Sequence, residues 1–229
     1  MSLESSIKRG VSMRIFLAAT VLLLILTAGC TGGGGDQTTP EAKPTEAEPT
    51  GEKPASVLGI DADPTGVPAN TATSLGSIET CISVTTGATF DIDVFVDAVP
   101  SDRNLAGFDY FLRYDNSVLQ VTAVNHDMLL TSRPDAKLDE GGERVMPDTD
   151  GSLAVSNVDL NLAAAEPGGS RGVLARYQLQ AVASGTSSLR LEGAPTYLTD
   201  SSPVGYDPDQ VLGATIAVDE PCPESNATQ

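Results

Sequence analysis

The one histidine and the many carboxylates are the groups that could support catalysis in this chain of 229 residues. His126 lies in no recognisable nucleophile or metal motif, since neither GxSxG nor HExxH occurs. An active site requires a nucleophile, a base and a stabilising group in one constellation. We therefore expect no enzyme, no cofactor and no metal. A paired-carboxylate glycosidase stays open as an alternative, although the chain lacks tryptophan and has few aromatics to line a sugar cleft.

The first of three cysteines, Cys30, follows a secretory leader. Basic residues precede an apolar run of 12 residues, 15–26, which is too short for a membrane-spanning helix of about 20 residues. The segment Leu-Thr-Ala-Gly-Cys that ends at Cys30 resembles a bacterial lipobox, in which the cysteine receives a lipid. We expect residues 1–29 to be a signal peptide and Cys30 to anchor the protein to a membrane. An ordinary secretory signal with a chance cysteine is the alternative.

Lipidation of Cys30 would leave Cys81 and Cys222 as an even pair in an oxidising compartment. A disulfide between them is the simplest inference, and it would join the start and the end of the folded region. A metal or redox site is the alternative, but the sequence has no CxxC spacing.

Two aspartate-rich segments, 61–66 and 148–151, have the alternating carboxylates seen in calcium loops. Neither completes such a loop, because the first has Ala72 where a bidentate glutamate is needed. We expect Asx turns at both places, in which the side chain accepts a hydrogen bond from the backbone two residues later.

A row of outward side chains is the main candidate for binding. In the segment 107–115, alternation sends Phe108, Tyr110 and Leu112 to the core and Asp109, Phe111 and Arg113 to the surface. An outward phenylalanine between two charges has the composition of a binding patch with an aromatic anchor. The alternative is an aromatic ring that packs under a neighbouring loop or strand.

The elements that position these residues are short strands. Glycine and proline number 37 together, aromatics are 4%, and no helical periodicity is sustained. We predict strands at 75–85, 89–98, 107–115, 119–125, 152–160, 172–183, 187–192 and 211–218, with a further edge strand at 57–61. In the segment 89–98 we expect Asp93 and Phe95 to face water. Residues 126–151 read as a long polar insertion.

The domain plan follows from composition and charge. Residues 30–55 read as the lipidated cysteine and a disordered linker, 56–222 as one folded domain, and 223–229 as a disordered tail. The formal net charge is −18, and removal of the leader makes it about −20. A surface of that sign repels nucleic acid, because binding of phosphates needs clustered lysine and arginine.

Three segments in order resemble the cohesin family. The segment 105–124 (LAGFDYFLRYDNSVLQVTAV) is similar to its AGFDF-like strand and following YD turn. The segment 172–189 is similar to its GVLA strand, and 86–94 to the strand that precedes both. The resemblance implies an all-β fold, a flattened jelly-roll β-sandwich of about nine strands whose first and last strands are adjacent, in agreement with a Cys81–Cys222 bond.

The resemblance also implies a function. Cohesins bind dockerins, small calcium-loaded helical modules, through one face of one sheet that includes the AGFDF-like strand. In dockerin-binding cohesins from cellulosomes, an asparagine and an aspartate on this strand help form the contact. The aligned positions here are Gly107 and Asp109, so the aspartate is retained and the asparagine is not. Cohesin topology is also expected to place Arg176 and Gln178, on the same side as Leu174, beside Asp109 and Arg113.

We therefore expect an extracellular docking module, held at the cell surface through the Cys30 lipid, that binds a partner protein through Asp109, Phe111, Arg113, Arg176 and Gln178. A dockerin on a polysaccharide-degrading protein is the partner that the resemblance implies. The alternative from another class is a carbohydrate-binding module of the cell envelope, for which Phe111 and two tyrosines offer few stacking surfaces. A purely structural envelope protein is the third possibility.

Overall fold

The computed structural model describes residues 55–143 and 145–224. The predicted signal peptide, the Cys30 lipid site and most of the linker lie outside these residues. The described residues form twelve strands and two single-turn 3-10 helices, η1 (Leu129–Thr131) and η2 (Leu162–Ala164). The strands are β1 (Val57–Asp61), β2 (Cys81–Val84), β3 (Thr89–Asp97), β4 (Gly107–Arg113), β5 (Leu119–Asn125), β6 (Leu138–Gly142), β7 (Ser152–Asp159), β8 (Gly172–Ala181), β9 (Gly185–Thr199), β10 (Gly205–Tyr206), β11 (Gln210–Leu212) and β12 (Ala214–Val218). The all-β prediction is confirmed.

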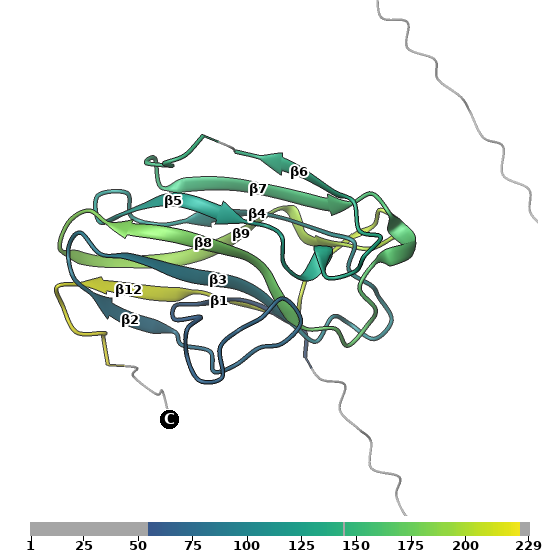
Figure 1. The fold of residues 1–229 in the computed structure, drawn as a ribbon, viewed down its shortest axis with the longest axis horizontal. Helices are drawn as coiled ribbons and strands as arrows, with labels where there is room; N and C mark the ends of the chain where they lie inside the picture. Colours follow the sequence, from purple (N-terminus) through teal and green to yellow (C-terminus); the bar gives the residue numbers. More distant parts are fainter. Residues whose placement is uncertain (1–54, 144, 225–229) are drawn as a thin grey trace, which may run out of the picture. The chain divides into compact units, whose positions relative to one another are not determined.

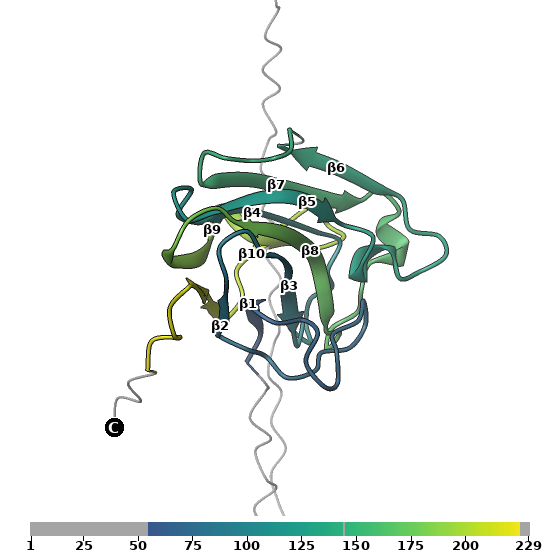
Figure 2. The same ribbon diagram turned by 60° about the vertical axis from the view of Figure 1, so that its left-hand side comes forward.

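The strands form two sheets, as a β-sandwich requires. The first has the order β11-β1-β3-β8-β5. The second has the order β2-β12-β9-β4-β7-β6, and β10 pairs with β9. Strands far apart in sequence lie side by side, such as β3 beside β8 and β2 beside β12 (Figures 1 and 2). None of the helices in the described residues is long and apolar enough to cross a membrane.

The core is filled by alternate side chains of both sheets. Tyr110 of β4 and Tyr177 of β8 are both fully buried, and their hydroxyl oxygens are 2.7 Å apart. This hydrogen bond joins the two sheets across the core. Neither hydroxyl is therefore a buried polar group without a partner, which would destabilise the fold.

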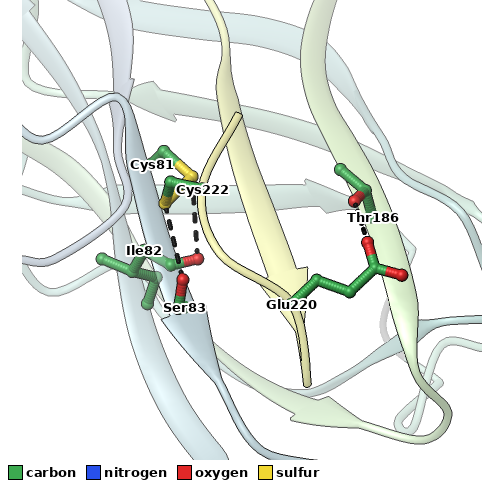
Figure 3. The surroundings of a disulfide bond; sticks show 6 residues. All are labelled: Cys81, Ile82, Ser83, Thr186, Glu220 and Cys222. Carbon is green, nitrogen blue, oxygen red and sulfur yellow. Dashed lines mark hydrogen bonds between the residues drawn. A yellow bond between two sulfur atoms is a disulfide. The ribbon is translucent and has the colours of Figure 1, made fainter. Parts of the chain in front are cut away.

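Strand pairing and a disulfide hold the two ends of the domain together. Strand β12 pairs in parallel with β2, and β11 pairs in parallel with β1, so early and late strands are neighbours. The predicted disulfide is present between Cys81 and Cys222, which are 141 positions apart. Figure 3 shows β12 between β2 and the strand that carries Thr186, whose hydroxyl donates a 3.2 Å hydrogen bond to Glu220. The segment after β12 is thus held on both sides.

Several strand boundaries differ from the prediction. The predicted strand 75–85 is reduced to β2, because the backbone N–H of Glu79 bonds to the Asp61 side chain instead of joining a ladder. The predicted strand 211–218 is divided at Gly213, and 187–192 lies in the first half of the longer β9. Strands β6 and β10 were not predicted.

Two side chains expected to face water are buried instead. Asp93 is fully buried, since the segment that contains Asn70 covers the outer face of β3 and bonds to it. Phe95 is 2% exposed, and its ring lies over Gly59 of β1, where an added Cβ would be only 2.5 Å from the ring. The outer face of the first sheet is therefore partly covered by the chain itself.

Candidate functional site

Strand β4 presents the predicted row of side chains. Tyr110 and Leu112 are fully buried, whereas Asp109, Phe111 and Arg113 are only half-buried and alternate with them. The outward direction of these three residues is confirmed. Because β4 is paired on both sides, with β7 and β9, the row stands on the middle of a sheet and not on a loop.

The Phe111 ring is covered by its neighbour. The guanidinium carbon of Arg113 is 4.8 Å from the ring centroid, a cation–π distance. Arg113 also donates to Glu192 of β9 at 2.8 Å and to the Ser152 hydroxyl of β7. The surface therefore offers a Phe111–Arg113 stack held from both flanking strands.

Asp109 lies at the other end of the row. Partial burial raises the pKa of its carboxyl group, and a hydrogen bond from Ser156 opposes that rise. Ser156 is also its register partner on β7. A partly desolvated carboxylate of this kind is well placed to accept hydrogen bonds from a partner that excludes water.

The strand beside the row carries small side chains. Ser152, Ala154 and Ser156 of β7 are the register partners of Arg113, Phe111 and Asp109. Small side chains therefore flank the row on its β7 side. The alternation of Ser and Ala with Leu153 and Val155 predicts this strand, and it is the signal in the sequence that could have assigned β7 to the site.

Gly107 stands where the resemblance to cohesins would place an asparagine. A Cβ at this position would lie 2.7 Å from the Asn157 carbonyl oxygen and 3.3 Å from the Val158 Cα. The neighbouring strand therefore leaves no room for an asparagine side chain here. Any recognition by this face must rely on the residues from Asp109 onward.

Arg176 and Gln178 do not join this row. They lie on β8, in the other sheet of the sandwich, so the expectation that they neighbour Asp109 and Arg113 is wrong. Arg176 donates from Nε and an Nη to the two carboxylate oxygens of Asp93, at 2.7 and 2.8 Å, while Gln178 is exposed. The expectation that Leu174 and Arg176 face the same side of the sheet is also wrong. A register shift in the β3–β8 pairing turns the Leu174 side chain into the core.

The segment 126–151 is more closely packed on the domain than a polar insertion would be. Leu129 and Leu130 of η1 are buried in the core, and β6 extends the second sheet by pairing with β7. The mixture of charges in the sequence hides β6, since LDEGG has neither apolar alternation nor β-branched residues.

The two aspartate-rich segments form the predicted Asx turns. Asp61 and Asp63 accept hydrogen bonds from the N–H groups of Asp63 and Thr65, each at 3.1 Å. Asp148 and Asp150 accept from the N–H groups of Asp150 and Ser152, at 3.3 and 2.9 Å. These side chains therefore fix local turns.

Comparison with known proteins supports the fold. No protein-family model and no curated protein sequence matches the chain. Among solved structures, the solution structure of CaCohA2 from Clostridium acetobutylicum is 18% identical, with a TM-score of 0.51, and the match covers 73% of this chain and 92% of that one. The OlpA cohesin in a type I cohesin–dockerin complex from Clostridium thermocellum is 14% identical, with a TM-score of 0.50, and the match covers 72% and 99%. The fold is a cohesin-like jelly-roll β-sandwich.

Proposed function

We propose that this protein is a cell-surface docking module that binds a partner protein through the outer face of β4, β7 and β9. The observation that carries the proposal is the row of Asp109, Phe111 and Arg113 on the middle of a sheet, backed by the fully buried Tyr110 and Leu112. A row fixed in this way loses little side-chain entropy on binding, which favours affinity.

The chemistry of the face favours a protein over a polysaccharide. A sugar-binding strip needs flat aromatic rings open to the ligand, whereas the one phenylalanine here is covered by Arg113. Arginine and aromatic residues beside small polar ones are typical of the centre of protein interfaces. The cohesin-like fold, and the dockerin bound to the OlpA cohesin, lead us to propose a calcium-loaded dockerin as the partner.

The location is part of the same proposal. A lipid on Cys30 would hold the protein to a membrane, and the segment 31–55 would act as a spacer between lipid and domain. At about 3.1 Å per residue for a polyproline-like chain, those 25 residues give a reach of roughly 75 Å. Metabolic labelling with a radioactive fatty acid, compared between the wild type and Cys30→Ser, tests the anchor.

Calorimetric titration with a panel of calcium-loaded dockerins tests the docking function. We expect at least one dockerin to bind, and Phe111→Ala or Asp109→Ala to weaken it by about tenfold or more, the loss typical of a residue at an interface centre. Gln178→Ala on the other sheet is the matched control and should leave the affinity unchanged. If no dockerin binds, or if both β4 variants bind as the wild type does, the proposal fails.

A further inference from the structure

The proposed docking face carries a second arginine beside Arg113. Arg190 of β9 is the register partner of Arg113 on β4. Residues directly opposite each other in an antiparallel pair have their Cβ atoms about 5 Å apart, and like charges at such positions destabilise the sheet. Two of only 13 basic residues, against 31 acidic ones, are thus placed side by side.

The two arginines differ in their partners. Arg113 donates from Nε to the Glu192 carboxylate at 2.8 Å. Arg190 is exposed, and its side chain has no hydrogen bond or ion pair with any of the described residues. The guanidinium group of Arg190 is therefore available to a ligand.

Both arginines line one pocket at the end of β4. Its volume is about 290 Å³. This value is just below the roughly 300 Å³ at which pockets for drug-sized ligands begin, so the pocket suits a group the size of one side chain. The other residues that line it are Tyr114, Asp115, Thr186 and Ser188.

The groups that remain available on the pocket wall are mainly hydrogen-bond donors. The Thr186 hydroxyl already donates to Glu220, at 3.2 Å. The Tyr114 hydroxyl already donates to Asp148, at 2.7 Å. The Ser188 hydroxyl is exposed and has no partner among the described residues. A guanidinium group has five N–H donors and no acceptor, and its planar fork matches a carboxylate, so the pocket suits a negatively charged acceptor.

Asp115 is the one carboxylate among the residues that line the pocket. It accepts hydrogen bonds from the Ser117 hydroxyl at 2.6 Å and from the Ser117 N–H at 2.9 Å, and these lower the pKa of Asp115. Asp115 is thus charged and held in its own turn, and it forms no ion pair with Arg113 or Arg190. Its charge opposes a second anion and limits the affinity of the pocket for one.

We propose that this β4–β9 pocket receives an acidic side chain, an aspartate or a glutamate, of the polypeptide that docks on the β4 face. The carboxylate would lie between Arg113 and Arg190 and accept a hydrogen bond from the Ser188 hydroxyl. The net charge of −18 repels acidic partners at long range, so the contact adds specificity for a matched partner and not speed of approach. The inference rests on the proposed function in taking a docked protein as the ligand.

NMR titration of the full chain with Ac-Gly-Glu-Gly-amide and with its glutamine analogue tests the inference. We expect saturable shifts of the Ser188 and Arg190 amides with the glutamate peptide and none with the glutamine peptide. Arg190→Gln should weaken binding by about tenfold or more, because charge-assisted hydrogen bonds are lost. Arg171→Gln removes an exposed arginine outside the pocket and should change nothing. Asp115→Asn keeps an acceptor for the turn, removes the opposing charge and should strengthen binding by about twofold or more.

Four results would overturn the inference. Equal shifts with the glutamine peptide would show that charge is not recognised. Equal weakening by Arg171→Gln would show that diffuse charge, and not the pocket, attracts the peptide. Unchanged binding to Asp115→Asn would place the bound carboxylate elsewhere. Saturation of the same shifts by sodium phosphate alone, at a lower concentration than the glutamate peptide requires, would identify an inorganic anion site.

The same preparation separates this inference from the proposed function. Glutamate-peptide binding in a protein that binds no dockerin would reject the proposed function alone. Dockerin binding without shifts from the glutamate peptide would reject the pocket alone.

Discussion

At the residue scale, strand β4 carries aromatic side chains on both of its faces. Tyr110 points into the core and bonds to Tyr177 of the other sheet, and Phe111 points to the outer face. Adjacent residues of one strand therefore serve folding and the proposed binding. Substitutions on β4 must be tested for folding as well as for binding.

The tyrosine pair gives a prediction that concerns folding alone and not binding. Tyr110→Phe leaves the Tyr177 hydroxyl buried without its partner, so we expect a loss of about 1–3 kcal/mol of unfolding free energy. Tyr110→Phe with Tyr177→Phe removes both hydroxyls and should cost less than the sum of the single changes. Urea unfolding of the wild type, Tyr110→Phe, Tyr177→Phe and the double variant measures this, and strict additivity would contradict the role of the hydrogen bond.

At the element scale, Arg176 acts in the packing of the first sheet. It forms two hydrogen bonds with the fully buried Asp93, which also accepts a 3.2 Å hydrogen bond from Asn70. These contacts hold the covering segment 62–80 to β3 and β8. The Arg176 side chain is 31% exposed, so part of the Asp93 charge would be relieved by water if Arg176 were lost.

Arg176→Ala should therefore destabilise the fold by about 3 kcal/mol, because removal of one partner leaves a buried charge uncompensated. Gln178→Ala, two residues away and exposed on the same strand, should change stability by less than about 0.5 kcal/mol. Thermal unfolding compares the two. An equally small effect of both would mean that Asp93 does not depend on Arg176.

The end of β12 contains a pH-dependent contact. Asp219 accepts hydrogen bonds from the Thr86 hydroxyl at 2.6 Å and from its N–H at 3.0 Å, and these lower the pKa of Asp219. A lowered pKa means that the contact stabilises the fold above about pH 3.9, the ordinary aspartate value, and is lost as the pH falls through the folded-state value. Asp219→Asn should therefore cost stability at pH 7 and little at pH 2.5, in urea titrations at both pH values. A constant cost would contradict this.

The strands that were predicted well are those with strict alternation. β3, β4, β5, β7 and β8 were located to within one or two residues, because a half-buried strand repeats its pattern every second residue. What the sequence could not reveal was coverage by other segments. Asp93 and Phe95 have the pattern of outward residues, yet tertiary contacts from Asn70 and Gly59 bury or cover them. The sequence also does not show which strands share a sheet. The expected proximity of Arg176 and Gln178 to the β4 row was therefore wrong.

At the scale of the whole molecule, the disulfide joins β2, near the start of the domain, to the segment that follows β12, near its end. Cys81 and Cys222 close a loop with a sequence separation of 141 residues, next to the parallel β2–β12 pair. A cross-link of this length restricts the unfolded chain strongly. The bond should therefore act mainly on stability, and the proposed docking face of β4, in the middle of the same sheet, should keep its geometry without it.

Cys81→Ser with Cys222→Ser should lower the unfolding free energy by about 2–5 kcal/mol. We expect dockerin affinity at low temperature to stay unchanged in this variant. Calorimetric unfolding and a binding titration of the same preparation measure both quantities. A loss of affinity in a protein that is still folded would show that the clip also shapes the docking face.

The most direct test of the account is a hydrogen–deuterium exchange footprint of the complex with the tightest-binding dockerin. Amide exchange reports which backbone segments become protected on binding. We expect new protection in β4, β7 and β9 and in the turns that flank them, with β3, β8 and β5 unchanged. Protection confined to β3, β8 and β5 would place the partner on the other sheet and contradict the central claim.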